Sequence, residues 1–299
     1  MKALVTGAHG FVGPYLTAHL EAMGDEVVGV DQDMDIADAE AVRARLAAEM
    51  PDVVYHLAAA SHVGDSWHAP AEVLRINTEG TLNVMLAAHE AGAERVVIIG
   101  SAEQYGQVPE KLLPITEDTP LQPVSPYGAS KAAAEMLGSY MVRGRDFPVV
   151  LVRAFNHLGP GQSDRLVASA IARQVAENER SGGLEILAGD LSPRRDFTDV
   201  RDVVRAYRLL AEKGVPGEAY NVCSGRAVAI RELADTLIAL SGAPMKVVLD
   251  PERLRPVDVP VVLGDNTKIV GDTGWKPEIP LEQTLADILT WWRHKISGR

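Results

Sequence analysis

Short apolar runs alternate with amphipathic segments through the first half of the chain. Five runs are nearly continuously apolar, which predicts strands buried on both faces of a parallel sheet: Lys2–Thr6, Glu26–Val30, Val53–Leu57, Arg95–Ile99 and Val149–Arg153. Between them the pattern predicts helices at Phe11–Met23, Ala37–Glu49, Thr78–Ala91 and Pro126–Arg143. Gly24 and Gly92 follow two of these helices, where glycine is favoured, and Ser125-Pro126 is typical of a helix start. The alternation predicts right-handed crossovers and a doubly wound parallel sheet of the α/β class.

After Phe155 the pattern becomes less regular. Loops rich in glycine, proline and charge separate helices that we expect near Leu166–Glu179, Asp199–Lys213, Ile230–Ser241 and Leu281–Lys295. We expect a first domain over residues 1–155, to which segments near 196–222 and 260–272 return. The remainder, largely residues 156–299, is expected to form a smaller α/β lobe that binds the substrate.

The composition narrows the class of protein. A chain of 299 residues with 46% hydrophobic and 23% charged residues is typical of a globular protein and excludes a disordered one. No apolar run approaches the roughly 18 residues that span a bilayer, and we expect no cleavable signal before Gly7, so a soluble cytoplasmic protein with no membrane partner is predicted. A net charge of −12 without a basic block argues against a nucleic-acid partner. Cys223 is the single cysteine and the histidines lack HExxH spacing, so we expect neither an internal disulfide nor a catalytic metal.

A glycine-rich stretch directly follows the first strand and opens the first helix: Thr6-Gly7-Ala8-His9-Gly10-Phe11-Val12-Gly13. Gly7 allows the chain to turn, Gly10 allows backbone amides to approach a pyrophosphate, and Gly13 allows close packing of the helix. Phe11 and Val12 belong to the same cofactor loop. In this strand–turn–helix context the spacing predicts a dinucleotide-binding domain of the Rossmann type, with a structural glycine turn as the alternative.

An acidic residue extends the cofactor prediction. Asp31 ends the second strand about 20 residues further on, where a carboxylate accepts hydrogen bonds from the adenosine ribose. Its charge repels a 2′-phosphate, so NAD(H) is favoured and NADP(H) is the alternative. Asp35 and Ile36, after a third short extended piece, are candidates for flanking the adenine, and a helix cap is the other interpretation of that pair.

A second candidate cluster is Tyr127-Gly128-Ala129-Ser130-Lys131, because residues four apart share one helix face. A phenol beside an ammonium is expected to have a lowered pKa, which would suit Tyr127 to general acid or base catalysis on a sugar hydroxyl or carbonyl. Ser101 ends the fourth strand at the sheet edge where open α/β sheets bind ligands, and its hydroxyl is a candidate for holding the reacting oxygen. Taken alone, Ser101 is better explained as a turn residue.

Together the glycine loop, Ser101, Tyr127 and Lys131 resemble the extended short-chain dehydrogenase/reductase family, and the resemblance covers nearly the whole chain. Its sugar-nucleotide branch acts on nucleotide-diphospho-sugars. The resemblance implies that Lys131 also binds the nicotinamide ribose and that Ser101 and Tyr127 flank C4 of a hexose. It further implies that Leu57, Ala58 and Ala59 line the cofactor, together with Asn77, which supports the active-site region.

The second half resembles, within this branch, the GDP-6-deoxy-D-mannose reductases, in three stretches: Phe155–Gln162, Arg194–Asp202 and Arg253–Pro260. These enzymes reduce the C4 ketone of GDP-4-keto-6-deoxy-D-mannose and release GDP-D-rhamnose. The resemblance implies that Asn156, Arg195 and Arg255 hold the diphosphate, which suits planar guanidinium groups, although a surface salt bridge is the alternative for either arginine. It also implies that the sugar faces Ser61, His62 and Val63, with a satisfied loop histidine as the other interpretation of His62.

Glu103 leaves a second activity open. It lies two positions before Tyr105, where GDP-mannose 4,6-dehydratases carry the glutamate that removes a C5 proton. The chain is, however, shorter than typical dehydratases, and it carries Asp196-Phe197-Thr198-Asp199 where Trp-Gly-His is expected in them. We therefore favour an NAD(P)H-dependent reductase, with a cofactor-retaining dehydratase or epimerase as the alternative and a silent sensor of nicotinamide cofactor as a minor third. Family members commonly pair the helices at Thr78–Ala91 and Pro126–Arg143, which implies a homodimer. Leu82, Met85 and Leu86 are candidates for its interface, although burial within one chain explains them equally well.

Overall fold

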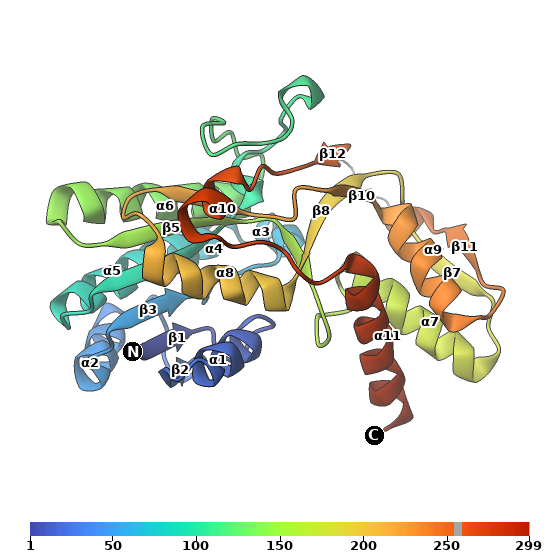
Figure 1. The fold of residues 1–299 in the computed structure, drawn as a ribbon, viewed down its shortest axis with the longest axis horizontal. Coiled ribbons are helices and arrows are strands. Elements are labelled where there is room, and N and C mark those ends of the chain that lie inside the picture. Colours follow the sequence, from blue (N-terminus) through green and yellow to red (C-terminus); the bar gives the residue numbers. More distant parts are fainter. Residues whose placement is uncertain (254–258, 299) are drawn as a thin grey trace.

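The computed structural model describes residues 1–253 and 259–298. A parallel sheet of six strands forms its centre (Figure 1). Its strands in spatial order are β2 (Glu26–Val30), β1 (Lys2–Thr6), β3 (Val53–His56), β4 (Arg95–Ser101), β5 (Val149–Ala154) and β9 (Ala219–Val222). The predicted doubly wound α/β fold is confirmed, and five of the strands lie where the apolar runs placed them.

The register brings several loops to one edge of this sheet. Thr6 pairs with Val30 on one side and with His56 on the other, so β1, β2 and β3 end level with one another. The order β2-β1-β3 reverses the direction of winding at β1, and open α/β sheets bind ligands outside such a switch point. The glycine loop, Asp31 and the residues after His56 therefore all lie at the same crevice.

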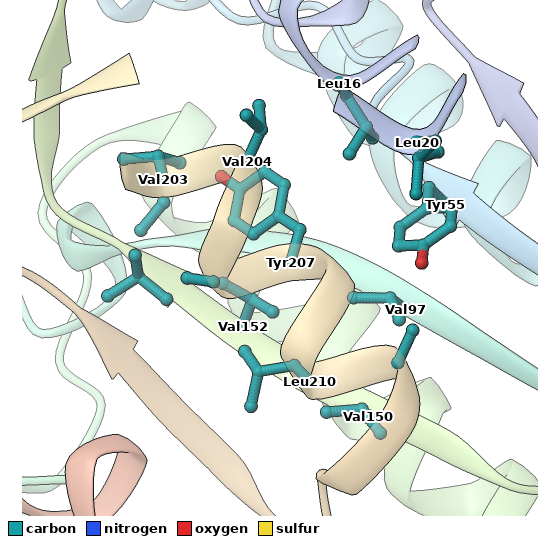
Figure 2. Close-up of a cluster of buried hydrophobic side chains, with 14 of the residues drawn as sticks. Leu16, Leu20, Tyr55, Val97, Val150, Val152, Val203, Val204, Tyr207 and Leu210 are labelled. Carbon is teal, nitrogen blue, oxygen red and sulfur yellow. The ribbon is translucent and has the colours of Figure 1, made fainter. Parts of the chain in front are cut away.

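Helices cover both faces of the sheet. One layer contains α1 (Gly13–Ala22), α8 (Val200–Lys213) and α10 (Thr267–Thr273), and the other contains α2 (Ala39–Glu49), α5 (Gly80–Glu90) and α6 (Pro126–Arg145). Figure 2 shows Val204, Tyr207 and Leu210 of α8 against Val97 and Val150 of the sheet. Alternate strand residues face the two layers, which is why these strands are apolar at nearly every position.

Short helical turns connect the main elements. They are α3 (Val63–Ser66), α4 (Pro70–Leu74), the π-helical turn η1 (Arg75–Glu79), and the 3₁₀ turns η2 (Ala102–Gln104), η3 (Glu110–Leu112) and η4 (Pro251–Arg253). The sequence pattern did not predict them. The helix expected from Thr78 begins as α5 at Gly80 because η1 occupies the two preceding residues.

The second half builds a separate apolar core at one end of the molecule (Figure 1). It packs α7 (Val167–Ser181), α9 (Ile230–Ser241) and α11 (Leu281–Ser297) against a two-stranded sheet of β7 (Glu185–Ala188) and β11 (Lys246–Leu249). Between this core and the main sheet lie β6 (Asn156–Leu158), β8 (Arg194–Asp199), β10 (Ala227–Ala229) and β12 (Val261–Val262). Among the described residues no helix is both long and apolar enough to cross a membrane.

Candidate active site

The glycine loop has the backbone geometry that a pyrophosphate site requires. Gly7 has a φ of +71°, and a Cβ there would lie 2.8 Å from the Ala58 amide nitrogen. At Gly13 a Cβ would lie 2.3 Å from the Ala8 carbonyl oxygen, so α1 starts closer to the loop than any side chain allows. No side chain caps α1, and within residues 1–253 and 259–298 the amides of Phe11 and Val12 have no acceptor. Amides directed outward from a helix start suit a phosphate group, so these residues fit the expected dinucleotide.

Asp31 lies beside this loop as expected. Its Oδ2 accepts a hydrogen bond of 2.8 Å from the backbone N–H of His9, which holds the carboxylate at the end of β2. The stretch after Asp31 forms turns rather than the extended piece that we expected. Asp35 closes one of these turns by accepting from the Ala37 N–H, and it does not cap α2, since Asp38 does. Ile36 is buried.

The loop after β3 packs against the glycine loop. Leu57 and Ala58 donate their N–H groups to the carbonyl and hydroxyl of Thr6, at 3.2 and 3.1 Å, and Ala59 follows. Asn77 is buried in η1. Its amide group bonds to both backbone groups of Ala60 and donates to the Ser130 hydroxyl at 2.9 Å. Asn77 therefore ties this loop to α6.

Ser101 and Tyr127 meet at the carboxyl end of β4. The Ser101 hydroxyl lies close enough to the phenol to act on its pKa, and Tyr127 is nearly buried in the first turn of α6, which Ser125 caps. One turn further along α6, the Lys131 Nζ donates to the Ile99 carbonyl oxygen at 2.7 Å and lies 6.0 Å from the centre of the Tyr127 ring. The three candidate catalytic side chains are thus brought together.

The expected lowering of the Tyr127 pKa is wrong for this structure. Burial raises the pKa of the Tyr127 phenol to about 12, although the nearby Ser101 hydroxyl acts in the opposite direction. Burial also lowers the pKa of Lys131 to about 8. Desolvation of the phenol therefore outweighs any help from the neighbouring amine. A phenol with this pKa is protonated at neutral pH, which suits a proton donor better than a base.

Glu103 lies next to this cluster. Its N–H donates to the Ser101 hydroxyl at 3.2 Å, and a Cβ on Gly128 would fall 2.5 Å from the Glu103 carbonyl oxygen. The charge of Glu103 contributes to the raised pKa of Tyr127. Its carboxylate therefore acts on the same phenol that the sequence placed at the reaction centre.

The residues expected to bind the substrate are not gathered as closely as the candidate catalytic residues. Asn156 on β6 is exposed, and β6 pairs with β8 so that Asn156 lies opposite Phe197, two residues beyond Arg195. Arg195 donates to the Arg194 carbonyl at 2.8 Å. Arg255 lies outside the described residues. Among the residues that are described, no group of three or more histidine, cysteine or acidic side chains is arranged to hold a metal.

His62 has the local structural role that the sequence analysis gave as the alternative to sugar binding. Its Nδ1 accepts from the Asp65 N–H at 3.3 Å and caps α3, between Ser61 and Val63. Arg165 forms a bidentate ion pair with Asp65, at 2.8 and 3.0 Å, and its Nη2 is 3.3 Å from the same Nδ1. This ring nitrogen is therefore already used, and contact with a sugar stays a prediction.

Sequence reasoning missed a buried polar network beneath Ser101. Gln104, Glu135 and Arg153 form it, with Tyr105 and Asn221. One signal was present in the sequence, because Arg153 stands in an otherwise apolar strand and a buried charge needs a partner.

A dinucleotide fold whose crevice holds a serine and a tyrosine side by side, next to a buried lysine, defines a nicotinamide-dependent enzyme of the extended short-chain dehydrogenase/reductase class. The chain belongs to the NAD dependent epimerase/dehydratase family, whose sequence model matches residues 3–223. The expected enzyme class and its dependence on a nicotinamide cofactor are therefore confirmed.

Proteins with several different activities are similar to this chain. The chain is 38% identical to GDP-6-deoxy-D-mannose reductase of Pseudomonas aeruginosa, over 99% of this chain and 98% of that protein. It is 32% identical to UDP-glucose 4-epimerase of Mycolicibacterium smegmatis, over 99% of both chains. Among solved structures, RMD from Pseudomonas aeruginosa complexed with NADPH superposes with a TM-score of 0.93 at 37% identity, covering 98% of this chain and 99% of that one.

Proposed function

We propose that this protein reduces the C4 ketone of GDP-4-keto-6-deoxy-D-mannose with NADH or NADPH and releases GDP-D-rhamnose. The observation that carries the proposal is the arrangement of Tyr127 beside Ser101 and one helical turn from Lys131 at the carboxyl end of β4. The similarity to a GDP-6-deoxy-D-mannose reductase along the whole chain supports this substrate over other nucleotide sugars.

The cofactor would be held by groups that are already in place. The amides of Phe11 and Val12 would receive the pyrophosphate, Asp31 the adenosine ribose, and Lys131 the nicotinamide ribose. The carboxylate of Asp31 favours NAD(H), and the NADPH bound to RMD from Pseudomonas aeruginosa supports acceptance of NADP(H) as well. When bound, the reduced nicotinamide supplies the hydride that reduces the carbonyl carbon.

The chain's own residues complete the reduction. Tyr127 donates its phenolic proton to the carbonyl oxygen, so the ketone gains one hydride and one proton and becomes an alcohol. Ser101, whose hydroxyl lies beside that phenol, holds the same oxygen. The Lys131 ammonium stabilises the phenolate left on Tyr127, since an opposite charge nearby favours the ionised form.

The substrate would lie between the two cores. Asn156, Arg195 and Arg255 would hold the diphosphate, and Ser61, His62 and Val63 would face the hexose. Guanidinium groups suit a diphosphate because they form bidentate, charge-assisted hydrogen bonds. We further propose that the protein works in the cytoplasm.

A homodimer through α5 and α6 is part of the proposal. Of the candidate interface residues, Met85 is fully buried and Leu82 and Leu86 are partly buried against the same core. On α6, however, Met136 is 73% exposed and Tyr140 is 44% exposed, which leaves an apolar face for a second copy. Sedimentation velocity tests the state: a monomer at micromolar concentration would contradict it.

The test offers the purified protein GDP-4-keto-6-deoxy-D-mannose with NADH and, separately, with NADPH. We expect one reduced cofactor to be consumed for each sugar, and GDP-D-rhamnose to appear by mass spectrometry and NMR. Turnover of the sugar nucleotide without net loss of reduced cofactor would contradict a reductase. Cofactor binding without turnover of any nucleotide sugar would indicate a sensing module instead.

Glu103 favours one alternative activity, a dehydratase that retains its cofactor. Its carboxylate lies close enough to Tyr127 to raise the pKa of the phenol, and a base at that place is what removal of a C5 proton requires. The two activities differ in stoichiometry. Incubation with GDP-mannose and oxidised cofactor alone would yield a 4-keto sugar from a dehydratase and nothing from a reductase.

A further inference from the structure

Three polar contacts join α6 to the end of β4. Tyr127, Lys131 and Glu135 are four residues apart, so they share the face of α6 that is directed at β4. Tyr127 lies beside Ser101, and Lys131 donates to the Ile99 carbonyl oxygen. The third contact, from Glu135, touches neither the crevice nor any residue assigned above to catalysis.

Gln104 makes this third contact. Its Nε2 donates to Glu135 Oε2 at 2.7 Å, while its Oε1 accepts from the backbone N–H of Ser101 at 2.7 Å. One buried amide therefore links the peptide of the serine to the helix that carries the tyrosine. A Cβ on Gly100 would lie 2.3 Å from the Gln104 Oε1, so glycine at that position leaves room for the amide.

An ion pair fixes the carboxylate that Gln104 binds. Arg153 donates to both oxygens of Glu135, from Nε at 2.9 Å and from Nη2 at 2.6 Å. The Arg153 Nη1 donates to the hydroxyl of Tyr105 at 2.8 Å, and that hydroxyl donates to the Oδ1 of Asn221 at 2.7 Å. All of these side chains are buried. A satisfied buried network is rigid, whereas a buried ion pair alone is poor evidence for added stability.

We propose that Gln104, held by the Glu135–Arg153 pair, is a positioning residue that sets the distance between the hydroxyls of Ser101 and Tyr127. The inference rests on the proposed function, in which those two hydroxyls hold and protonate the reacting oxygen. Ser101 and Tyr127 come from different elements, so their separation depends on how β4 and α6 are joined. A displacement of about 1 Å in such a pair costs about 100-fold in rate.

The first test replaces the amide with a chain of similar shape. In Gln104→Met both hydrogen bonds are lost, and we expect kcat to fall by about 10- to 100-fold while the KM for the sugar nucleotide and the Kd for the cofactor stay unchanged. Exchange of the Ser101 amide hydrogen should also accelerate. Gln174→Met is the matched control, because Gln174 bridges α7 to the backbone of Leu187 far from Ser101, and it should leave kcat unchanged.

The second test exchanges the amide at position 104 and the carboxylate at position 135. Q104E alone places two carboxylates in contact and should lower kcat further than Gln104→Met. The double variant Q104E/E135Q restores the chain: the carboxylate at position 104 accepts from Ser101 and from the amide at position 135, whose oxygen accepts from Arg153. We expect it to recover at least about tenfold in kcat over Q104E, a coupling that two independent sites would not show.

Either of two results would overturn the inference. The first is a wild-type kcat and unchanged Ser101 exchange in Gln104→Met, and the second is a reversed pair no faster than Q104E. Amide exchange needs no substrate, so it separates this inference from the proposed function. A wild-type protein inactive on every keto sugar would contradict the function alone, while unaltered exchange in Gln104→Met would contradict the positioning role.

Discussion

Lowering the pH should destabilise the protein through His56 in particular. This ring is buried at the end of β3, with its nitrogens 2.8 Å from the Thr6 hydroxyl and 3.0 Å from the Thr81 hydroxyl. Burial lowers the pKa of His56 from 6.5 to about 3, and the nearby charge of Lys131 acts in the same direction. In the unfolded chain the ring regains its ordinary pKa, so the unfolded state binds the proton first.

The sign and size of the effect follow from linkage. Above about pH 6.5 neither state is protonated at His56, and the residue adds no pH dependence. As the pH falls from there toward 3, the unfolded state gains stability by about 1.4 kcal/mol per pH unit. Between about pH 7.5 and about pH 5 the free energy of unfolding should therefore drop by about 2 kcal/mol from this residue alone.

Urea unfolding at the two pH values measures this drop, and His56→Gln isolates it, because glutamine can still bond to both threonines. Burial also lowers the pKa of His19 and of His157, so the variant itself loses some stability on acidification. The contribution of His56 is therefore the difference between the losses of the wild type and of the variant. We expect the variant to lose about 2 kcal/mol less than the wild type on acidification. His68→Gln, at an exposed position, should behave like the wild type. An equal loss in His56→Gln and in the wild type would refute the reasoning.

Three further predictions concern the cofactor site and the core. Gly13→Ala drives a Cβ to 2.3 Å from the Ala8 carbonyl, so cofactor affinity should fall by about tenfold or more by fluorescence titration, while Gly271→Ala, which meets no atom within 4 Å, should not change it. In Asp31→Asn the charge that opposes a 2′-phosphate is lost, and the ratio of kcat/KM for NADPH to that for NADH should rise by about tenfold; an unchanged ratio would remove Asp31 from cofactor selection. Leu210→Ala leaves a cavity in the fully buried layer of Figure 2 and should cost about 2–5 kcal/mol in urea unfolding, and a loss below about 1 kcal/mol would mean that the site is not packed as described.

The sequence predicted the central sheet because burial on both faces leaves a local mark. Runs such as Val53–Leu57 are apolar at nearly every position, and the glycine spacing after Thr6 reflects contacts that a Cβ would break. The small connecting turns leave no such mark. The turn α3 depends on a cap from His62, and η1 follows α4 with no side-chain cap, so neither produces a periodic pattern.

The sequence predicted which residues form the site, but it did not predict the electrostatics of the site. The four-residue spacing placed Tyr127 beside Lys131, and the structure confirms that they are neighbours. The direction of the Tyr127 pKa shift depends on how deeply the phenol is buried, which spacing along one helix does not contain. The partner of Arg153 was equally hidden, because Glu135 is adjacent to it only after β5 and α6 pack together.

The measurement that tests the central claim most directly is the turnover of Tyr127→Phe on GDP-4-keto-6-deoxy-D-mannose. The substitution keeps the ring and removes only the hydroxyl that lies beside Ser101. If this phenol protonates the C4 oxygen, kcat should fall by about 100- to 10,000-fold while NAD(P)H binds with its wild-type Kd. A variant that keeps the wild-type kcat would show that the proton comes from another group.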